Sequence, residues 1–151
     1  MNRLPCTVKT TGGMEQFDFE RLEVYQLALE FLDRLIHLCR HLPTELRYPL
    51  SDQLIRAGLS ISNNLAEGTG KRSCKEKARY YATAIDSARE CISMLNVLFR
   101  QTPSADNHVY YLETRSMGRR ITSMLHKLIS SLDGTRYTVH GTRNHADRPS
   151  S

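Results

Sequence analysis

Basic residues gather around a short glycine-containing stretch, and residues of this type commonly contact phosphate groups. Gly68 and Gly70 are followed closely by five cations, which are Lys71, Arg72, Lys75, Lys77 and Arg79. Lys and Arg side chains make many of the contacts that proteins form with a nucleic-acid backbone. Tyr80 comes next in the chain, and an aromatic ring can stack on an exposed base. The cluster predicts a nucleic-acid surface, and the competing interpretation is an ordinary solvated charged face.

A second group of cations comes from the fourth predicted helix. If the third and fourth helices are antiparallel about a turn near Thr102, residue 79 lies opposite residue 126 and residue 85 opposite residue 120. Three further cations then approach the first cluster: Arg119, Arg120 and Lys127. Acidic residues concentrate before the middle of the first helix: Glu15, Asp18, Glu20, Glu23, Glu30 and Asp33. This distribution predicts a subunit with one basic end, which suits a phosphate backbone.

A polar stripe repeats with helical spacing just before the glycines. Its members are Arg56, Ser60, Asn63, Asn64 and Glu67. In the structural interpretation, Asn64 and Glu67 hydrogen-bond the turn at residues 68–70 or the start of the next helix. In the functional interpretation, the stripe lines a subunit contact or a ligand groove. The sequence leaves both open.

The remaining reactive side chains do not form a catalytic set. His37 and His41 are four residues apart with Asp33 one turn earlier, but a metal ion needs further ligands at fixed geometry. Cys74 stands among cations at the predicted start of a helix, yet no His or Asn partner that a nucleophilic cysteine needs is evident. Phosphate-binding, dinucleotide-binding and nucleophile-elbow motifs are absent from the sequence. We therefore predict a protein that is not an enzyme, with no metal, no cofactor and no small-molecule substrate.

Composition indicates a globular protein of one domain. The chain has 151 residues, 40% hydrophobic and 25% charged, with a net charge of +5. No apolar run approaches the ~20 residues of a membrane-spanning helix, and the first residues lack the apolar core of a secretory signal. Four cysteines occur without a C-x-x-C pair, which favours a reduced, cytoplasmic chain. Cys39 and Cys91 fall on apolar helical stripes and are predicted core residues.

Hydrophobic periodicity predicts four helices, at 22–42, 50–67, 73–100 and from about 104 to 132. Pro43 and Pro49 bracket a predicted loop, Gly68 and Gly70 are expected to end the second helix with left-handed backbone, and Ser73 with Glu76 fits a capping box. Short connections between the helices favour an antiparallel up-down bundle. The predicted fold is all-α, an antiparallel up-down four-helix bundle over residues 17–132 with disordered tails at 1–16 and 133–151.

The predicted apolar faces place the core and suggest an assembly. The first helix has an apolar face widened by Tyr25, Leu32, Ile36 and Cys39, which we interpret as burial on two sides and hence as a homo-oligomer. The third helix carries Ala82 on its predicted seam, and the fourth carries Val109 and Leu112. All three are expected to be buried.

These residues also carry a resemblance. Leu-Glu-Val-Tyr at 22–25, Gln-Leu-Ile-Arg-Ala at 53–57, Ser-Ile-Ser-Asn-Asn-Leu-Ala-Glu-Gly at 60–68 and Lys-Arg-Ser at 71–73 resemble the bacterial four helix bundle protein family, also called the 23S ribosomal RNA intervening-sequence protein family. The similarity covers roughly residues 17–132, with Ile55 and Asp86 departing from the family pattern. It implies an all-α bundle, commonly a homopentamer, and an RNA role. It implies no established catalytic activity.

Two functions follow as hypotheses. The first is a non-enzymatic, oligomeric accessory protein that binds RNA or a ribonucleoprotein through its basic end. The alternative is a protein–protein interaction scaffold with no nucleic-acid role. Neither predicts a membrane partner.

Overall fold

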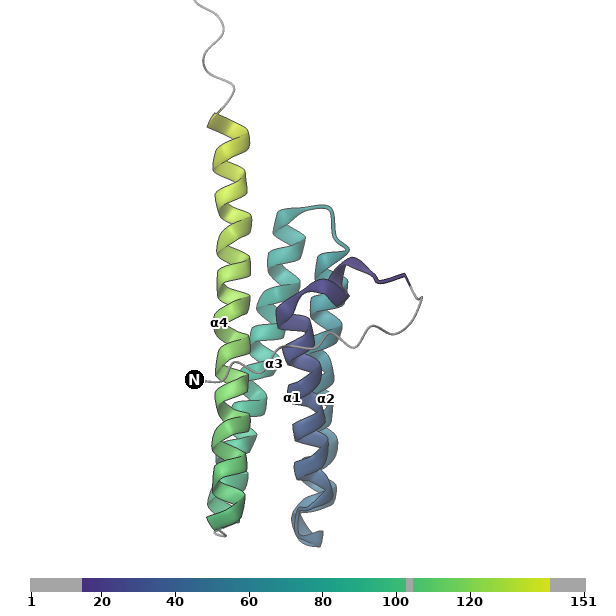
Figure 1. Ribbon diagram of the computed structural model, residues 1–151, viewed down its shortest axis with the longest axis vertical. Helices are drawn as coiled ribbons and strands as arrows, with labels where there is room; N and C mark the ends of the chain where they lie inside the picture. The colour runs from purple at the N-terminus through teal and green to yellow at the C-terminus, as the bar shows by residue number, and fades with distance from the viewer. Residues whose placement is uncertain (1–14, 103–104, 142–151) are drawn as a thin grey trace, which may run out of the picture.

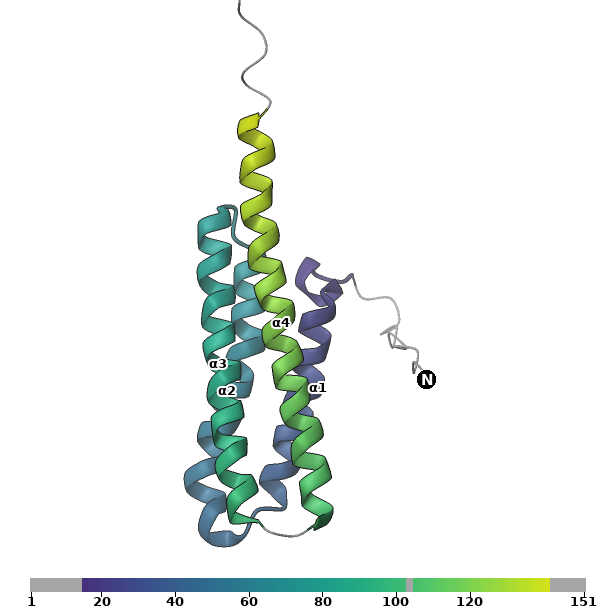
Figure 2. The same cartoon turned by 90° about the vertical axis from the view of Figure 1, so that its left-hand side faces the viewer.

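Four long α-helices and one short 3-10 helix make up the part of the chain that the structure describes. The computed structural model describes residues 15–102 and 105–141, with side chains described for 15–102 and 107–134. The elements are η1 (Asp18–Arg21), α1 (Glu23–Arg40), α2 (Thr44–Thr69), α3 (Cys74–Gln101) and α4 (Ala105–Gly141). Figures 1 and 2 show the helices along one long axis, with successive helices running in opposite directions. The antiparallel up-down four-helix bundle is confirmed; residues 1–14 and 142–151 of the predicted tails lie outside the described residues.

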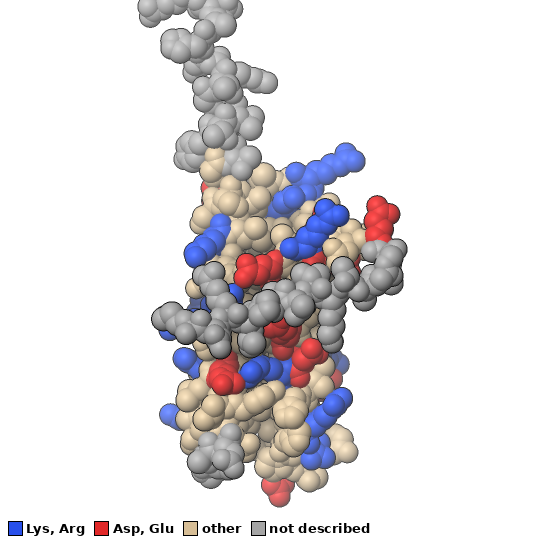
Figure 3. All heavy atoms as spheres, in the orientation of Figure 1, with Lys and Arg blue, Asp and Glu red and all other residues tan. Residues whose placement is uncertain are grey.

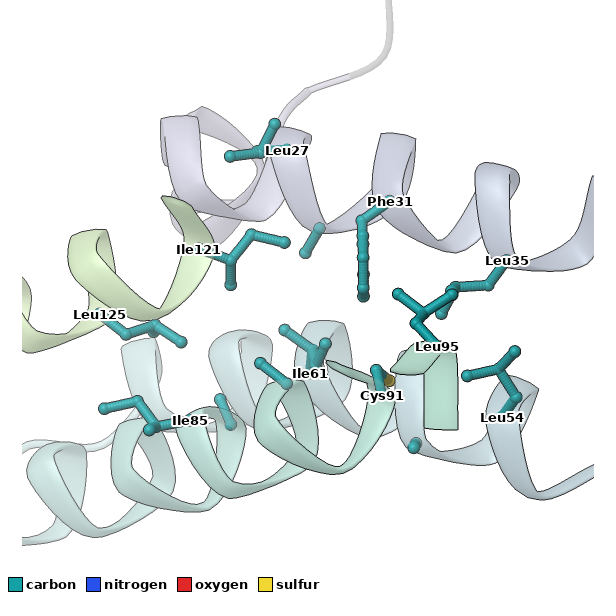
Figure 4. Close-up of a cluster of buried hydrophobic side chains, with 14 of the residues drawn as sticks. Leu27, Phe31, Leu35, Leu54, Ile61, Ile85, Cys91, Leu95, Ile121 and Leu125 are labelled. Carbon is teal, nitrogen blue, oxygen red and sulfur yellow. The ribbon is translucent and has the colours of Figure 1, made fainter. Parts of the chain in front are cut away.

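One hydrophobic core runs along the bundle axis and receives side chains from all four helices. α1 packs against α2 and α4, and α3 packs against α2 and α4. Fully buried residues from the four helices meet in this core (Figure 4), including Phe31, Leu35, Leu54, Ile61, Leu95, Ile121 and Leu125. Each such side chain contributes about 1.5–3 kcal/mol through its removal from water. The packing of one subunit therefore accounts for most of the apolar positions on the stripes that the sequence displays.

Cys39 and Cys91 are core residues, as predicted. Burial raises the pKa of the Cys39 thiol, and burial together with the nearby Glu90 charge raises the pKa of Cys91 to about 12. Both thiols are thus protonated at neutral pH and are poor nucleophiles.

The wide apolar face of α1 is used within one subunit. Of the four residues that widen this face, Leu32 and Cys39 are buried, and Leu32 lies beside Gly58 of α2, whereas Tyr25 and Ile36 are only half-buried. Because α1 packs against both α2 and α4, burial on two sides needs no second subunit. The homo-oligomer therefore stays a prediction, without support from the width of this face.

The predicted loop between the two prolines is wrong, because α2 begins at Thr44 and contains Pro49. The N–H groups of Leu46 and Arg47 each donate to the Pro43 carbonyl at 3.0 Å, which starts the helix. The Arg47 guanidinium also donates to the Leu42 carbonyl at 3.0 Å and closes the corner with α1. Pro49 lies in the second turn, where it removes one hydrogen bond near the helix end rather than stopping the helix.

The prediction that Gly68 and Gly70 end α2 with left-handed backbone is also wrong. Gly70 caps α2 with φ −74° and ψ −8°, which is right-handed backbone open to any residue. Gly68 is required for close packing instead: a Cβ there would lie 2.8 Å from Tyr80 Cβ and 2.9 Å from Tyr81 Cε1. The absence of a side chain at Gly68 lets the end of α2 approach the start of α3.

Three residues predicted in the core are exposed: Ala82, Val109 and Leu112. Val109 is 61% and Leu112 is 56% exposed, whereas Thr114 is completely buried. The Thr114 hydroxyl donates to the Tyr110 carbonyl at 2.7 Å, which satisfies this polar group inside the bundle. The inward stripe of α4 therefore includes a threonine, and a count of apolar residues alone misses it.

α4 also continues past its predicted end at Leu132, to Gly141. Figure 1 shows its yellow end extending beyond the turn between α2 and α3. An interior glycine such as Gly134 lowers helix stability by only about 1 kcal/mol relative to alanine, so it does not by itself end a helix.

Candidate nucleic-acid interface

The start of α3 has half of the capping box that the sequence predicts, since the Glu76 carboxylate does not accept from the Ser73 N–H. The Ser73 hydroxyl accepts a hydrogen bond from the Glu76 N–H at 3.3 Å, which is the first half of the capping box. Lys77 reaches back from the first turn of α3, and its ammonium donates to the Thr69 carbonyl at 3.2 Å. This bond holds the end of α2 against the start of α3 and uses one of the predicted phosphate-binding cations.

Two further cations are held by the ring of Tyr80. The Lys71 ammonium lies 5.1 Å and the Arg79 guanidinium 5.9 Å from the ring centre, within the range of a cation–π interaction. Arg72 and Lys75 are exposed, and neither has a hydrogen-bond or ion-pair partner among the described residues. We call Lys71, Arg72, Lys75 and Arg79 together with Tyr80 the turn cluster. It combines two positioned cations with two that are free to reach an anion.

The predicted approach of the α4 cations to this cluster is wrong for Arg119 and Arg120, whereas the contacts between α3 and α4 keep Lys127 near the level of residues 83–84, about 7 Å along α3 from Arg79. A Cβ at Gly118 would contact Ile92 at 3.1 Å, and Arg115 donates to the Asn96 side chain at 3.1 Å. These contacts place Arg119 and Arg120 near the level of residue 91. That level is about 18 Å along α3 from Arg79 at 1.5 Å per residue. The register of α3 against α4 is set by the side chains that interlock between the two helices. Counting outward from the middle of their connection predicts it poorly.

The predicted separation of acidic and basic ends is wrong as well. α1 begins toward the end of the bundle where α2 ends and α3 begins (Figure 1). Burial, and to a smaller extent the charge of Asp18 just before α1, raises the pKa of Tyr81 of α3, so this carboxylate lies close to that side chain. The Arg120 guanidinium forms an ion pair with the Glu23 carboxylate at 3.1 Å. Blue and red side chains lie next to each other over the upper part of the face shown in Figure 3. Up-down topology causes this mixing, because it brings the start of α1 and the start of α3 to the same end.

Part of the polar stripe has a structural role between α2 and α3. The Asn64 amide donates to the Ser60 carbonyl at 2.7 Å and to the Ser60 hydroxyl at 3.1 Å. The Ser60 and Ser87 hydroxyls are 2.8 Å apart, and Ser87 also donates to the Thr83 carbonyl at 3.0 Å. This network supports the structural interpretation for Ser60 and Asn64, although their partners lie in α2 and α3 and not at the glycine turn.

The other members of the stripe face solvent. Arg56 forms an exposed ion pair with Asp52 at 3.1 Å, one turn earlier on the same helix. Asn63 and Glu67 are exposed and have no hydrogen-bond or ion-pair partner among the described residues. The bond between Glu67 and the turn that the structural interpretation expects is therefore not formed.

The two histidines are tied to each other and to α4. The His41 ring nitrogen Nδ1 lies 2.8 Å from the His37 carbonyl oxygen, and the His37 ring lies against Tyr110 with ring centres 5.2 Å apart. Within residues 15–102 and 107–134, no three metal-ligating side chains come together. Cys74 is partly exposed at the start of α3.

A groove between α1 and α4 is the feature that sequence reasoning missed. It has a volume of about 600 Å³ and is lined by Leu22, Glu23, Val24, Arg120, Ser123, Met124, Lys127, Leu128 and Ser131. The spacing of Arg120, Met124, Lys127 and Ser131 by three or four residues marks one helical face. That signal was available from the sequence, but only the packing leaves this face uncovered.

None of the helices in the described residues is both long enough and apolar enough to span a membrane.

Comparison with known proteins places the chain in a family. A crystal structure of a protein of unknown function from the S23 ribosomal protein family of Bacteroides thetaiotaomicron has a similar fold, with a TM-score of 0.63 and 24% sequence identity. The match covers 70% of this chain and 97% of that chain. A comparison with curated proteins finds no match. The profile of the 23S rRNA-intervening sequence protein family matches residues 20–127, most of the helical bundle, and the chain therefore belongs to that family.

Proposed function

We propose that the protein is a non-enzymatic accessory protein that binds RNA, alone or in a ribonucleoprotein, through the turn cluster. The observation that carries the proposal is the turn cluster, in which Lys71 and Arg79 lie over the Tyr80 ring while Arg72 and Lys75 have no partner among the described residues. Lys and Arg placed in this way neutralise phosphates without reading sequence. The name of the family, which refers to an intervening sequence of 23S rRNA, adds support for an RNA partner.

The geometry favours weak binding that depends strongly on salt. Four cations that neutralise three or four phosphates of a single strand give a log–log salt slope of about −2 to −3. Between 50 and 200 mM salt, this slope corresponds to a loss of affinity of about 20- to 60-fold. Acidic groups near this end of the bundle, such as Asp18, whose charge adds to the effect of burial in raising the pKa of Tyr81, reduce the field and keep the affinity low.

The experiment measures binding of a labelled single-stranded RNA to the full chain at low salt and then across a salt series. Replacing Lys75 and Arg79 together by Glu is expected to abolish binding. The matched control replaces Arg89 and Arg100 by Glu, which makes the same charge change at exposed positions farther along α3. Equal loss in both double variants, or unchanged binding with Lys75→Glu and Arg79→Glu, would contradict a local site.

Substitution of Tyr80 distinguishes two roles of its ring, which are positioning cations and stacking on a base. Because Lys71 and Arg79 lie near its ring, Tyr80 positions cations in the free protein. Stacking on a base would add about 1–3 kcal/mol per base, so Tyr80→Ala is expected to weaken RNA binding without changing the salt slope. If the ring only holds cations, the same variant lowers the slope instead.

We also propose that the subunits form a homo-oligomer, with a pentamer as the specific form. Several copies of a weak site would then act on one polyanion through avidity. Light scattering at micromolar concentration tests the assembly separately from RNA binding, and a monomer mass would remove it. We also propose that the protein is located in the cytoplasm.

A further inference from the structure

The groove between α1 and α4 has an apolar floor with charges at its rim. Leu22, Val24, Met124 and Leu128 supply apolar surface, and Val24 is only 5% exposed. η1 packs against α1 and α2, so it turns away from α4. This leaves the α4 side of the first turn of α1 open, and the groove of about 600 Å³ lies there.

Two cations stand along the groove on one face of α4. Arg120 and Lys127 are seven residues apart, which is about 10.5 Å along a helix. Arg120 already binds a carboxylate, that of Glu23, at 3.1 Å. Lys127 is exposed and has no ion-pair or hydrogen-bond partner among the described residues. The groove is therefore complementary to carboxylates at its rim, with one cation unpaired.

The shape and chemistry of the groove fit a helix of a protein partner. Its α4 wall runs from Arg120 to Ser131, about 16 Å or three helical turns. A helix lying in such a groove buries apolar side chains spaced by three, four or seven residues. Aromatic rings add stacking energy to RNA binding, and the groove lining contains no aromatic residue, so its apolar floor favours a helix over an RNA strand.

We propose that this groove is a docking site for an acidic amphipathic helix of a protein partner. The partner places apolar side chains on Met124 and Leu128 and a carboxylate on Lys127. A second carboxylate, about two turns along the partner helix, shares Arg120 with Glu23. That ion pair is exposed, with side-chain exposures of 61% and 71%, so its partners exchange at little cost. This inference is independent of the proposed RNA function, since it uses different cations.

The test uses a fluorescent synthetic peptide of 15 residues that forms a helix, carries Leu on one face and has two Glu residues seven apart beside that face. We expect it to bind the full chain in a fluorescence anisotropy titration. A peptide with Lys in place of both Glu residues is expected to bind at least tenfold more weakly. A peptide that fails to bind, or two peptides that bind equally, would overturn the proposal.

Two single substitutions in the protein locate the site. Lys127→Glu, at an exposed position, is expected to weaken binding of the acidic peptide at least tenfold. Lys75→Glu makes the same charge change in the turn cluster and is expected to leave peptide binding unchanged. Equal effects of the two variants would indicate general attraction between the acidic peptide and the basic protein, and would contradict the assignment of the site to the groove.

A competition experiment separates the two kinds of partner. Unlabelled oligouridine of 15 nucleotides is expected not to displace the acidic peptide. Displacement that Lys127→Glu abolishes would assign the groove to RNA and overturn the proposal. RNA binding that fails while peptide binding succeeds contradicts only the proposed function.

Discussion

Replacing Gly68 by alanine tests the close approach of α2 and α3 most directly. The new Cβ would lie 2.8 Å from Tyr80 Cβ, which is 0.6 Å inside the 3.4 Å at which ordinary contact begins. Tyr80 Cβ is attached to the backbone and cannot rotate away, so α3 itself must shift. Such a shift would strain the hydrogen bond between the Thr69 and Tyr81 hydroxyls, which are 3.1 Å apart.

Two opposing terms set the size of the effect. Overpacking of a rigid contact costs about 1–3 kcal/mol, and the upper half of that range applies where backbone must move. Alanine also improves helix propensity over glycine by about 1 kcal/mol. We therefore expect Gly68→Ala to lower the free energy of unfolding by about 1–2 kcal/mol.

Two other glycines provide matched controls. A Cβ at Gly134 would meet no atom within 4 Å, so Gly134→Ala is expected to stabilise the helix or leave it unchanged. Gly70 has φ −74°, and the nearest atom to its Cβ would be 3.7 Å away, so Gly70→Ala should be neutral or slightly stabilising. A left-handed cap would instead make that substitution destabilising by about 1 kcal/mol.

Urea unfolding followed by far-UV circular dichroism gives the comparison, at one protein concentration and with unchanged m-values. A Gly68→Ala midpoint that rises together with that of Gly134→Ala would refute the reasoning about close packing. If the urea midpoint of Gly70→Ala falls as far as that of Gly68→Ala, the result would support left-handed backbone at Gly70.

Three further predictions follow from burial. Ile85→Asp is expected to unfold the bundle, since it places an unpaired charge at a position that is 6% exposed, and loss of the helical circular-dichroism signal checks it. The pKa of Cys91 is raised from 9.0 to about 12, so its contribution to stability is complete below pH 9 and is lost as pH rises toward 12. Between pH 8 and pH 10, ionisation of this thiol in the unfolded chain should lower the free energy of unfolding by about 1 kcal/mol. We expect urea unfolding of a Cys91→Ala variant to lack this part of the decrease. In a Cys6→Ser background, iodoacetamide is expected to modify Cys74 much faster than the buried Cys39 and Cys91 in the native state, and equal rates by mass spectrometry would contradict their burial.

The sequence alone determined the fold class and most of the helices. Apolar residues at helical spacing predicted α1 and α3 within about two residues, and Ser73 marked the start of α3. These features depend on local periodicity and on hydrogen bonds between residues three apart, which a single sequence displays directly. The burial of Cys39 and Cys91 followed from the same periodicity.

Tertiary structure alone decided which charges meet. The register of α3 against α4 depends on interlocking side chains such as Ile92 beside Gly118, and it moved Arg120 away from the turn cluster and onto Glu23. The role of Gly68 likewise depends on Tyr80, twelve residues away, because a contact between helices leaves no periodic trace in either one. The groove between α1 and α4 exists because η1 turns toward α2, and that direction is set by packing between helices rather than by local spacing.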